Sequence, residues 1–253
     1  MNRVYFIGAG PGDPSLLTLK GASLLAQCPA VFAPEPFEET FAELLLGKTV
    51  RIPFDFYFDE LLEKIEELLT EGNVAFLVPG DLTFYAPFQA LIDVLGDRSE
   101  AVPVVGTVNA ASAYLKKTLD LPGACNRAVI TSPRILEEEK GAPALRDLAA
   151  PGVTLLLYMN HLPLPQLAEQ LRAGYGRNVP IAIAHRLGLS GQEVVTGSLD
   201  DIVDRVGDRD FFNLENKNRR PALTLVIAGE TLTATVGKAW WDDRRDKIWK
   251  YRS

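Results

Sequence analysis

The residues that most strongly suggest chemistry stand near the N-terminus, where an apolar run ends in glycine and proline. The run 4–7 is followed by Gly8, Gly10 and Gly12, with Pro11 between the last two. Glycine at these positions permits a tight turn or a positive φ, and proline forbids an ordinary helix start there. We expect a loop that cradles a small molecule; a glycine turn without a ligand is the alternative.

Helix-start signals follow this loop directly. Asp13 is a candidate N-cap and Pro14 stands at the first helical position, with Leu16, Leu17 and Leu24 expected on the buried face. A dinucleotide-binding loop needs the pattern G-x-G-x-x-G, whereas this run reads G-x-G-P-G. The pattern therefore argues against NAD.

A second loop of the same kind follows the buried run 74–78. Pro79, Gly80 and Asp81 form a turn there, and Phe84 opens an expected helix. Ligands gather at the carboxyl ends of strands in a parallel sheet, so this loop and the first can face one cleft. Asp81 either caps the helix or lines the ligand site, where a carboxylate favours a cationic group.

A third candidate segment follows the strand-like run 102–105. It runs from Gly106 into a small-residue helix that contains Val108 and Asn109. The Asn109 side chain can donate and accept hydrogen bonds, whereas that of Val108 cannot. Tight packing of this helix on a sheet is as good an interpretation as direct ligand contact.

In the second half of the chain, the apolar run 153–159 ends in Met159, close to His161. His161 and His185 are the only histidines, and each is a possible proton carrier near neutral pH, although a structural role is more common. Without a family context, Met159 is more often a core residue. No cluster has metal-ligand spacing, and neither a nucleophile elbow nor a P-loop occurs, so no metal is expected.

The elements that must position these residues alternate between strand-like and helix-like patterns, which predicts an α/β fold, with a parallel sheet and crossover helices in the first half. In the first half the expected strands are 4–8, 30–33, 49–52, 74–79 and 101–105, and the expected helices 15–27, 38–46, 59–71, 84–95 and 108–118. In the second half the expected strands are 127–132, 153–159, 180–185, 193–196 and 222–228, and the expected helices 143–150, 163–173 and 199–207, the last capped by Ser198.

A Pro-Gly turn near residues 119–123 separates the two series. We expect an N-terminal α/β domain at 1–120 with the glycine-rich loop, a C-terminal α/β domain at 121–231, and an aromatic and basic tail at 232–253. Residues 208–220 are polar and are expected to form a loop. The tail could cover a site, pack on a partner subunit or form a short amphipathic helix, and the helix is favoured.

Composition narrows the class of protein. Among 253 residues, 47% are hydrophobic, and no apolar run approaches the roughly 18 residues of a membrane span. The formal net charge of −7 argues against a nucleic-acid partner. Cys28 and Cys125 are expected to be buried packing residues. With no leader-like N-terminus, the expected location is the cytoplasm.

Five of these stretches, in order from residue 4 to about 229, resemble the tetrapyrrole (corrin/porphyrin) methylases, the S-adenosylmethionine-dependent enzymes of corrin and sirohaem synthesis. They are the glycine-proline run 4–21, the Gly80-Asp81 loop, the segment 102–113, the strand ending in Met159, and the segment 180–199 with Gln192 before an apolar pair and Gly-x-Leu. Leu82 and Val105 replace two prolines of the family pattern.

The resemblance implies two α/β domains with S-adenosylmethionine as co-substrate in the cleft between them. The implied cofactor-binding residues are Gly10, Pro11, Pro79, Gly80, Asp81, Phe84, Val108, Asn109, Met159 and Leu187. No catalytic residue is assigned, because an enzyme of this kind mainly positions its reactants. Lys20, Arg134 and Arg186 are candidates for orienting the carboxylates of the macrocycle.

The implied function is C-methylation of a precorrin-type tetrapyrrole in cobalamin or sirohaem biosynthesis, by a homodimer. Two alternatives stay open: a family member that binds the cofactor or a tetrapyrrole without this turnover, and a diphthine synthase-like methyltransferase. The Gly-Pro-Gly-Asp-Pro opening favours tetrapyrroles over the latter.

Overall fold

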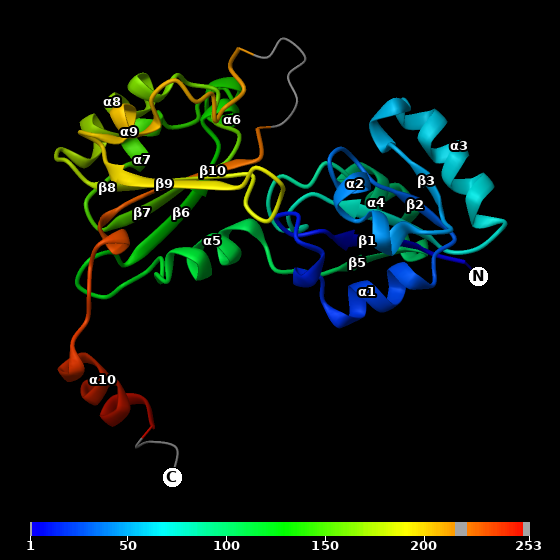
Figure 1. The fold of residues 1–253 in the computed structure, drawn as a ribbon, viewed down its shortest axis with the longest axis horizontal. Helices are drawn as coiled ribbons and strands as arrows, with labels where there is room; N and C mark the ends of the chain where they lie inside the picture. The colour runs from blue at the N-terminus through cyan, green and yellow to red at the C-terminus, as the bar shows by residue number, and fades with distance from the viewer. Residues whose placement is uncertain (1, 216–221, 250–253) are drawn as a thin grey trace. The chain divides into compact units, whose positions relative to one another are not determined.

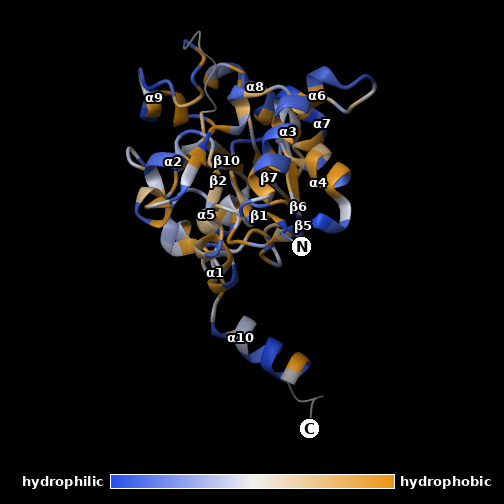
Figure 2. Ribbon diagram, turned by 90° about the vertical axis from the view of Figure 1, so that its right-hand side faces the viewer, coloured by the Kyte–Doolittle hydropathy of each residue, from blue (hydrophilic) through white to orange (hydrophobic). Residues whose placement is uncertain are grey.

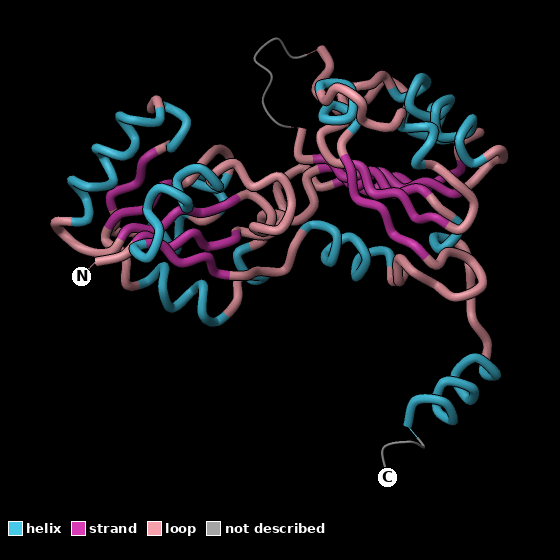
Figure 3. Tube along the Cα trace, turned by 180° about the vertical axis from the view of Figure 1, so that it is seen from behind, coloured by secondary structure: helices cyan, strands magenta, loops and turns pink. Residues whose placement is uncertain are grey.

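The computed structural model describes residues 2–215 and 222–249, and the chain divides into two compact units (Figure 1). One unit consists of Met1–Tyr114 together with Ala184–Val194, and the other of Leu115–Ile183 with Val195–Ser253. Each unit is built on its own five-stranded sheet (Figure 3). The fold is therefore a mixed α/β fold with two sheets, as the alternating pattern predicts.

The strands lie close to their expected positions. They are β1 Val4–Gly8, β2 Ala30–Phe32, β3 Thr49–Arg51, β4 Val74–Val78, β5 Ser99–Val102, β6 Arg127–Thr131, β7 Val153–Leu157, β8 Pro180–His185, β9 Glu193–Ser198 and β10 Thr224–Ala228. The helices are α1 Leu19–Ala26, α2 Phe37–Thr40, α3 Phe58–Leu69, α4 Gln89–Leu95, α5 Thr107–Leu115, α6 Pro133–Glu138, α7 Leu145–Leu148, α8 Leu164–Tyr175, α9 Ile202–Val206 and α10 Lys238–Arg244.

The first sheet has the strand order β3-β2-β4-β1-β5, and its pairings are parallel. Both of its faces are covered, because β1 and β4 alternate residues between two apolar clusters. Phe6 and Phe76 stack on one face at 4.9 Å between ring centroids, while Ile7 and Leu77 pack on the other. Burial on both faces explains the continuous apolar runs in the sequence.

The second sheet has the order β6-β7-β10-β8-β9, with β6 and β7 parallel and β7 and β10 antiparallel. Helix α8 packs on it through Leu167, Leu171 and Tyr175. The buried Tyr175 hydroxyl donates to the carbonyls of Val153 (3.2 Å) and Ala228 (3.0 Å). One side chain therefore connects α8 to β7 and β10.

Several expected helices differ from the observed ones. Helix α4 begins at Gln89 rather than at residue 84, because Pro87 disfavours helical backbone at the residue before it. Helix α9 begins at Ile202 and ends at Val206, with Asp201 rather than Ser198 at its N-cap position. Helix α6 was not predicted. Residues 208–215 form a loop, and the rest of the predicted 208–220 loop lies outside the described residues.

The two cysteines are buried, which confirms the packing interpretation. Burial raises the pKa of the Cys28 thiol to about 11, so the thiol stays neutral. In the tail, α10 and the π-helical turn Arg245–Trp249 confirm the expected helix, and α10 carries mostly hydrophilic residues (Figure 2). Residues 250–253 of the tail lie outside the described part.

Candidate ligand site

The glycine loop after β1 and the loop after β4 join directly at Gly10 and Gly80. Each N–H of these two residues donates to the carbonyl of the other at 2.9 Å, and Ala9 N–H donates to the Val78 carbonyl at 2.8 Å. Both glycines have positive φ, +64° and +73°, which other residues adopt only with strain. The two predicted ligand loops therefore form one junction at the carboxyl ends of their strands.

The backbone at this junction leaves room on one side. A Cβ on Gly80 would have Thr107 Oγ1 as its nearest neighbour, at 4.0 Å, whereas a Cβ on Gly10 would lie 3.0 Å from the Val105 carbonyl oxygen. A ligand can therefore approach the Gly80 backbone closely. A small cavity of about 180 Å³ adjoins this region, lined by 81–83 and 101–104.

The Asp81 carboxyl group lies between the second loop and the third candidate segment. Its Oδ1 accepts the N–H of Thr83 at 3.0 Å, and its Oδ2 lies against the Cα of Gly106, at the start of α5. The alternative in which Asp81 caps a helix is wrong, since the next helix, α4, begins only at Gln89. Negative charge beside the first turn of α5 is electrostatically favourable.

The other predicted residues of the first unit differ in their exposure. Pro11 and Leu187 are buried, Pro79 and Val108 are half-buried, and Asn109 is exposed with its Oδ1 close to Gly106. Phe84 lies in a loop with its ring exposed, rather than at a helix start. Asp13 does cap a helical turn, because its Oδ1 accepts the N–H of Ser15 at 2.8 Å.

Met159 belongs to the second unit, where it follows β7 with a φ of +48°. Near it, His161 Nε2 lies 2.6 Å from Glu137 Oε2, and His161 Nδ1 is buried with no hydrogen-bond partner in the described part of the chain. The predicted place of Met159 beside a cofactor stays a prediction.

The basic candidates differ in their partners. Lys20 pairs with Glu100 at 2.6 Å and Arg134 with Glu138 at 2.9 Å, whereas Arg186 Nε donates to the neutral carbonyl of Ser190 at 2.9 Å. The charges of Lys20 and Arg134 are thus partly balanced on the surface. The contact of Arg186 with Ser190 involves no opposite charge, so it does not balance the charge of the guanidinium group.

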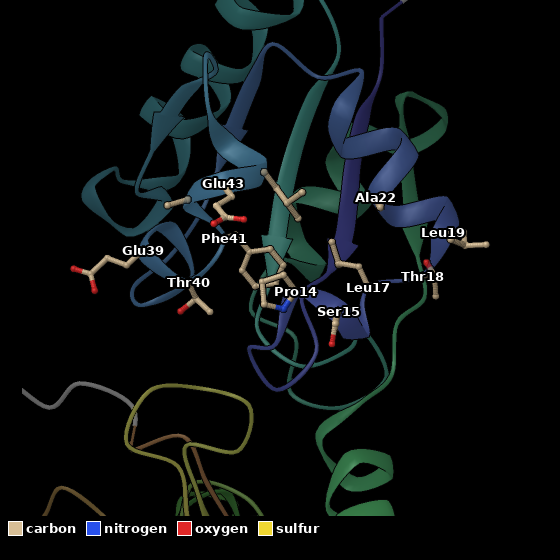
Figure 4. Close-up of a pocket in the computed structure, with 12 residues that line it drawn as sticks. Pro14, Ser15, Leu17, Thr18, Leu19, Ala22, Glu39, Thr40, Phe41 and Glu43 are labelled. Atoms are coloured by element: carbon tan, nitrogen blue, oxygen red, sulfur yellow. The ribbon is translucent and has the colours of Figure 1, made fainter.

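A larger, open pocket of about 610 Å³ lies beside the glycine loop (Figure 4). Residues 14–22 form one side and residues 39–44 the other, with Glu39 and Glu43 among the latter. Its lining is apolar and acidic, so it suits a cation better than a carboxylate. Among the described residues, no group of three or more His, Cys, Asp or Glu side chains is placed to bind a metal ion.

A sequence model of the tetrapyrrole (corrin/porphyrin) methylases matches residues 3–203. The chain belongs to this family. The precorrin-4 C(11)-methyltransferase of Pseudomonas aeruginosa is 34% identical to this methylase over 91% of each chain. The cobalt-precorrin-4 C(11)-methyltransferase of Methanocaldococcus jannaschii is 27% identical over 91% of this chain and 88% of its own.

Solved structures agree with the fold of this methylase. A cobalt precorrin-4 methyltransferase matches with a TM-score of 0.71 at 23% identity, covering 92% of this chain and 96% of its own. A uroporphyrin-III C-methyltransferase of Thermus thermophilus, solved with S-adenosylhomocysteine, matches with a TM-score of 0.65 at 25% identity, covering 91% of this chain and 99% of its own. This tetrapyrrole methylase is accordingly a methyltransferase.

Sequence reasoning identified the three loops but missed how they are held together. The contacts of Asp81 with Thr83 and Gly106 were not predicted, nor was the packing of the turn 186–192 on Gly12. The sequence contained a signal for the turn. Gly188 favours a turn, and Gln192, four residues later, has a side-chain oxygen that can accept a hydrogen bond from the turn backbone.

Proposed function

We propose that this tetrapyrrole methylase transfers the methyl group of S-adenosylmethionine to C11 of a precorrin-4-type macrocycle in cobalamin biosynthesis. The observation that carries the proposal is the Gly10–Gly80 junction, next to which the Asp81 carboxylate and the Asn109 Oδ1 both lie close to Gly106. The C11 assignment rests on the two precorrin-4 C(11)-methyltransferases that match over about nine-tenths of this chain.

The residues at the junction fit the co-substrate in shape and in charge. S-adenosylmethionine, when bound, supplies a methyl group on a positively charged sulfur. The bare Cα of Gly80 admits close contact, and the Asp81 carboxylate favours a cation nearby. Met159 and Leu187 complete the proposed set of contacts, as the family resemblance implies.

The chain's contribution to the reaction is positioning. The junction would orient the methyl donor so that a nucleophilic ring carbon can attack in line, and loop residues would exclude water from the reacting atoms. No general base is assigned. Arg186, whose hydrogen-bond partner is a neutral carbonyl, is the candidate for orienting a carboxylate of the macrocycle.

A second candidate substrate is uroporphyrinogen III. The siroheme synthase of Pseudomonas aeruginosa is 30% identical over 96% of this chain, and the chain spans 53% of that longer protein. The partial coverage makes this substrate the weaker candidate.

We further propose that the protein works as a cytoplasmic homodimer without a nucleic-acid partner. None of the helices in the described part of the chain has the length and apolar content that a bilayer-spanning helix needs.

The test is to supply S-adenosylmethionine with a ¹³C-labelled methyl group and, separately, a precorrin-4-type macrocycle or uroporphyrinogen III. NMR of the product then locates the label. We expect label at C11 of the precorrin-4-type macrocycle. Label only on uroporphyrinogen III would replace the C11 assignment with the second candidate, and label on neither would contradict both.

A further inference from the structure

The turn between β8 and β9 packs directly on the glycine loop that follows β1, within the first unit. The Cα of Gly12 faces Leu189, and a methyl group there would overlap the Leu189 side chain. Leu189 is only 6% exposed. The glycine loop is therefore in contact with a residue that lies more than 170 positions further along the chain.

A second close contact lies beside the first. A Cβ on Gly188 would lie 3.0 Å from the backbone nitrogen of Asp13 and 3.4 Å from Cγ of Pro11. The two backbones approach each other so closely that no side chain fits between them. Residues 11–13 thus rest against 188–189, and we expect a displacement of one segment to shift the other.

The turn itself is fixed by hydrogen bonds of its own. Gln192 Oε1 accepts the N–H of Gly188 at 2.7 Å, and the N–H of Leu189 donates to the Arg186 carbonyl at 2.9 Å. Arg186 and Gly188 have positive φ, +49° and +79°. Glycine adopts a positive φ readily, whereas Arg186 does so at a cost, and these bonds hold the turn that carries Leu189.

We propose that Leu189 and Gln192 are positioning residues for methyl-donor binding, which hold the glycine loop in the conformation that takes S-adenosylmethionine. This inference rests on the proposed function, since it concerns the same ligand. Leu189 acts by packing on Gly12, and Gln192 acts on the turn that presents Leu189. Neither residue needs to touch the methyl donor.

The experiment compares Leu189→Ala and Gln192→Met with the wild type. Leu189→Met and Gln192→Glu are conservative variants that keep the apolar bulk and the acceptor oxygen, and Thr196→Ala, exposed on β9, is the matched control. Three quantities are measured on the full chain: hydrogen exchange of the backbone amides of residues 8–13 other than Pro11 without ligand, the dissociation constant for S-adenosylhomocysteine, and the melting temperature.

We expect Leu189→Ala to bind S-adenosylhomocysteine about tenfold more weakly and Gln192→Met about threefold, since an exposed hydrogen bond contributes less than buried packing. Exchange at 8–13 should quicken in both, and the KM for S-adenosylmethionine should rise while that for the macrocycle does not. The conservative variants and Thr196→Ala should behave as the wild type.

The outcomes separate this inference from the proposed function. A wild type that binds no S-adenosylhomocysteine counts against the proposed function, and exchange at 8–13 then still tests whether Leu189 and Gln192 hold the loop. Unchanged exchange and unchanged affinity in Leu189→Ala and Gln192→Met, with or without a lower melting temperature, would overturn the inference.

Discussion

At the scale of one residue, the two carboxylate oxygens of Asp81 contact different segments of the chain. Its Oδ1 is occupied by the N–H of Thr83, while its Oδ2 faces Gly106 at the start of α5. The turn needs only an acceptor oxygen at Oδ1. The negative charge is therefore available to favour a cationic ligand.

We predict that Asp81→Asn weakens binding of S-adenosylmethionine by about 1 to 3 kcal/mol, the range for hydrogen bonds to charged groups. Asparagine keeps an acceptor for Thr83, so the melting temperature of the ligand-free protein should stay near that of the wild type. Calorimetric titration measures the affinity. S-adenosylhomocysteine lacks the sulfonium charge, and a smaller loss with it would place Asp81 nearer the sulfur than the amine.

Equal affinities of wild type and Asp81→Asn for both compounds would mean that the carboxylate acts on the loop alone. The sequence pattern indicated this residue because it stands at a strand end within a glycine turn. Its partner Gly106 could not be predicted, since that contact joins segments 25 positions apart.

Tyr175 shows at the scale of elements how a helix is held on its sheet. The hydroxyl is buried and donates to carbonyls of β7 and β10. Burial raises the pKa of Tyr175 above its usual range, because the phenolate is poorly solvated there. The folded protein therefore favours the neutral phenol.

We predict that Tyr175→Phe lowers the free energy of unfolding by about 1 kcal/mol at neutral pH, the net contribution of a typical hydrogen bond. A group whose pKa is raised on folding contributes fully to the free energy of unfolding while the pH is below its pKa in the unfolded chain, which is about 10 for tyrosine. This contribution is lost as the pH rises above that value. The difference between wild type and variant should therefore narrow above pH 10.

Urea unfolding at several pH values measures this difference. Affinity for S-adenosylhomocysteine should not change, since the Tyr175 hydroxyl bonds to carbonyls of β7 and β10 within the second unit and to neither loop of the glycine junction. A variant as stable as the wild type at neutral pH would show that the two hydrogen bonds do not stabilise the fold. A stability difference that grows with pH would contradict burial as the cause of the raised pKa of Tyr175.

The strands were predicted well because the central ones are buried on both faces, so β1, β4 and β7 appear as continuous apolar runs. The boundaries of the helices were predicted less well. Pro87 was a readable signal against a helix from residue 84, and Ser132 followed by Pro133 was a readable start for α6 that the prediction did not use. These errors came from local signals that were present and underweighted.

At the scale of the whole molecule, the predicted ligand residues other than Met159 fall within one unit, together with the segment Ala184–Val194. The family resemblance implied that Leu187, in this segment, binds the cofactor. The packing of Leu189 on Gly12 could not be read from the sequence, because no local pattern reports a contact between distant turns.

We predict that S-adenosylhomocysteine at a hundred times its dissociation constant stabilises the chain by about 2.7 kcal/mol, since a ligand that binds only the folded state shifts unfolding by mass action. Thermal unfolding should show a higher melting temperature. If the two units unfold separately, the shift should appear in the transition of the first unit. A folded sample with no shift at any ligand concentration would count against the co-substrate.

The central claim is that the glycine junction binds the methyl donor of a tetrapyrrole methyltransferase, and methyl transfer by Gly10→Val tests it most directly. Valine at φ +64°, with its Cβ 3.0 Å from the Val105 carbonyl oxygen, should close the junction. Gly47→Val is the matched control, because Gly47 also has a positive φ, +75°, in open space away from the junction.

Circular dichroism establishes that both variants are folded, and mass spectrometry follows the macrocycle. The account predicts that wild type and Gly47→Val form methylated tetrapyrrole and an equal amount of S-adenosylhomocysteine, whereas Gly10→Val forms neither. Transfer by folded Gly10→Val at the wild-type rate, or a folded wild type that methylates no tetrapyrrole, would contradict it.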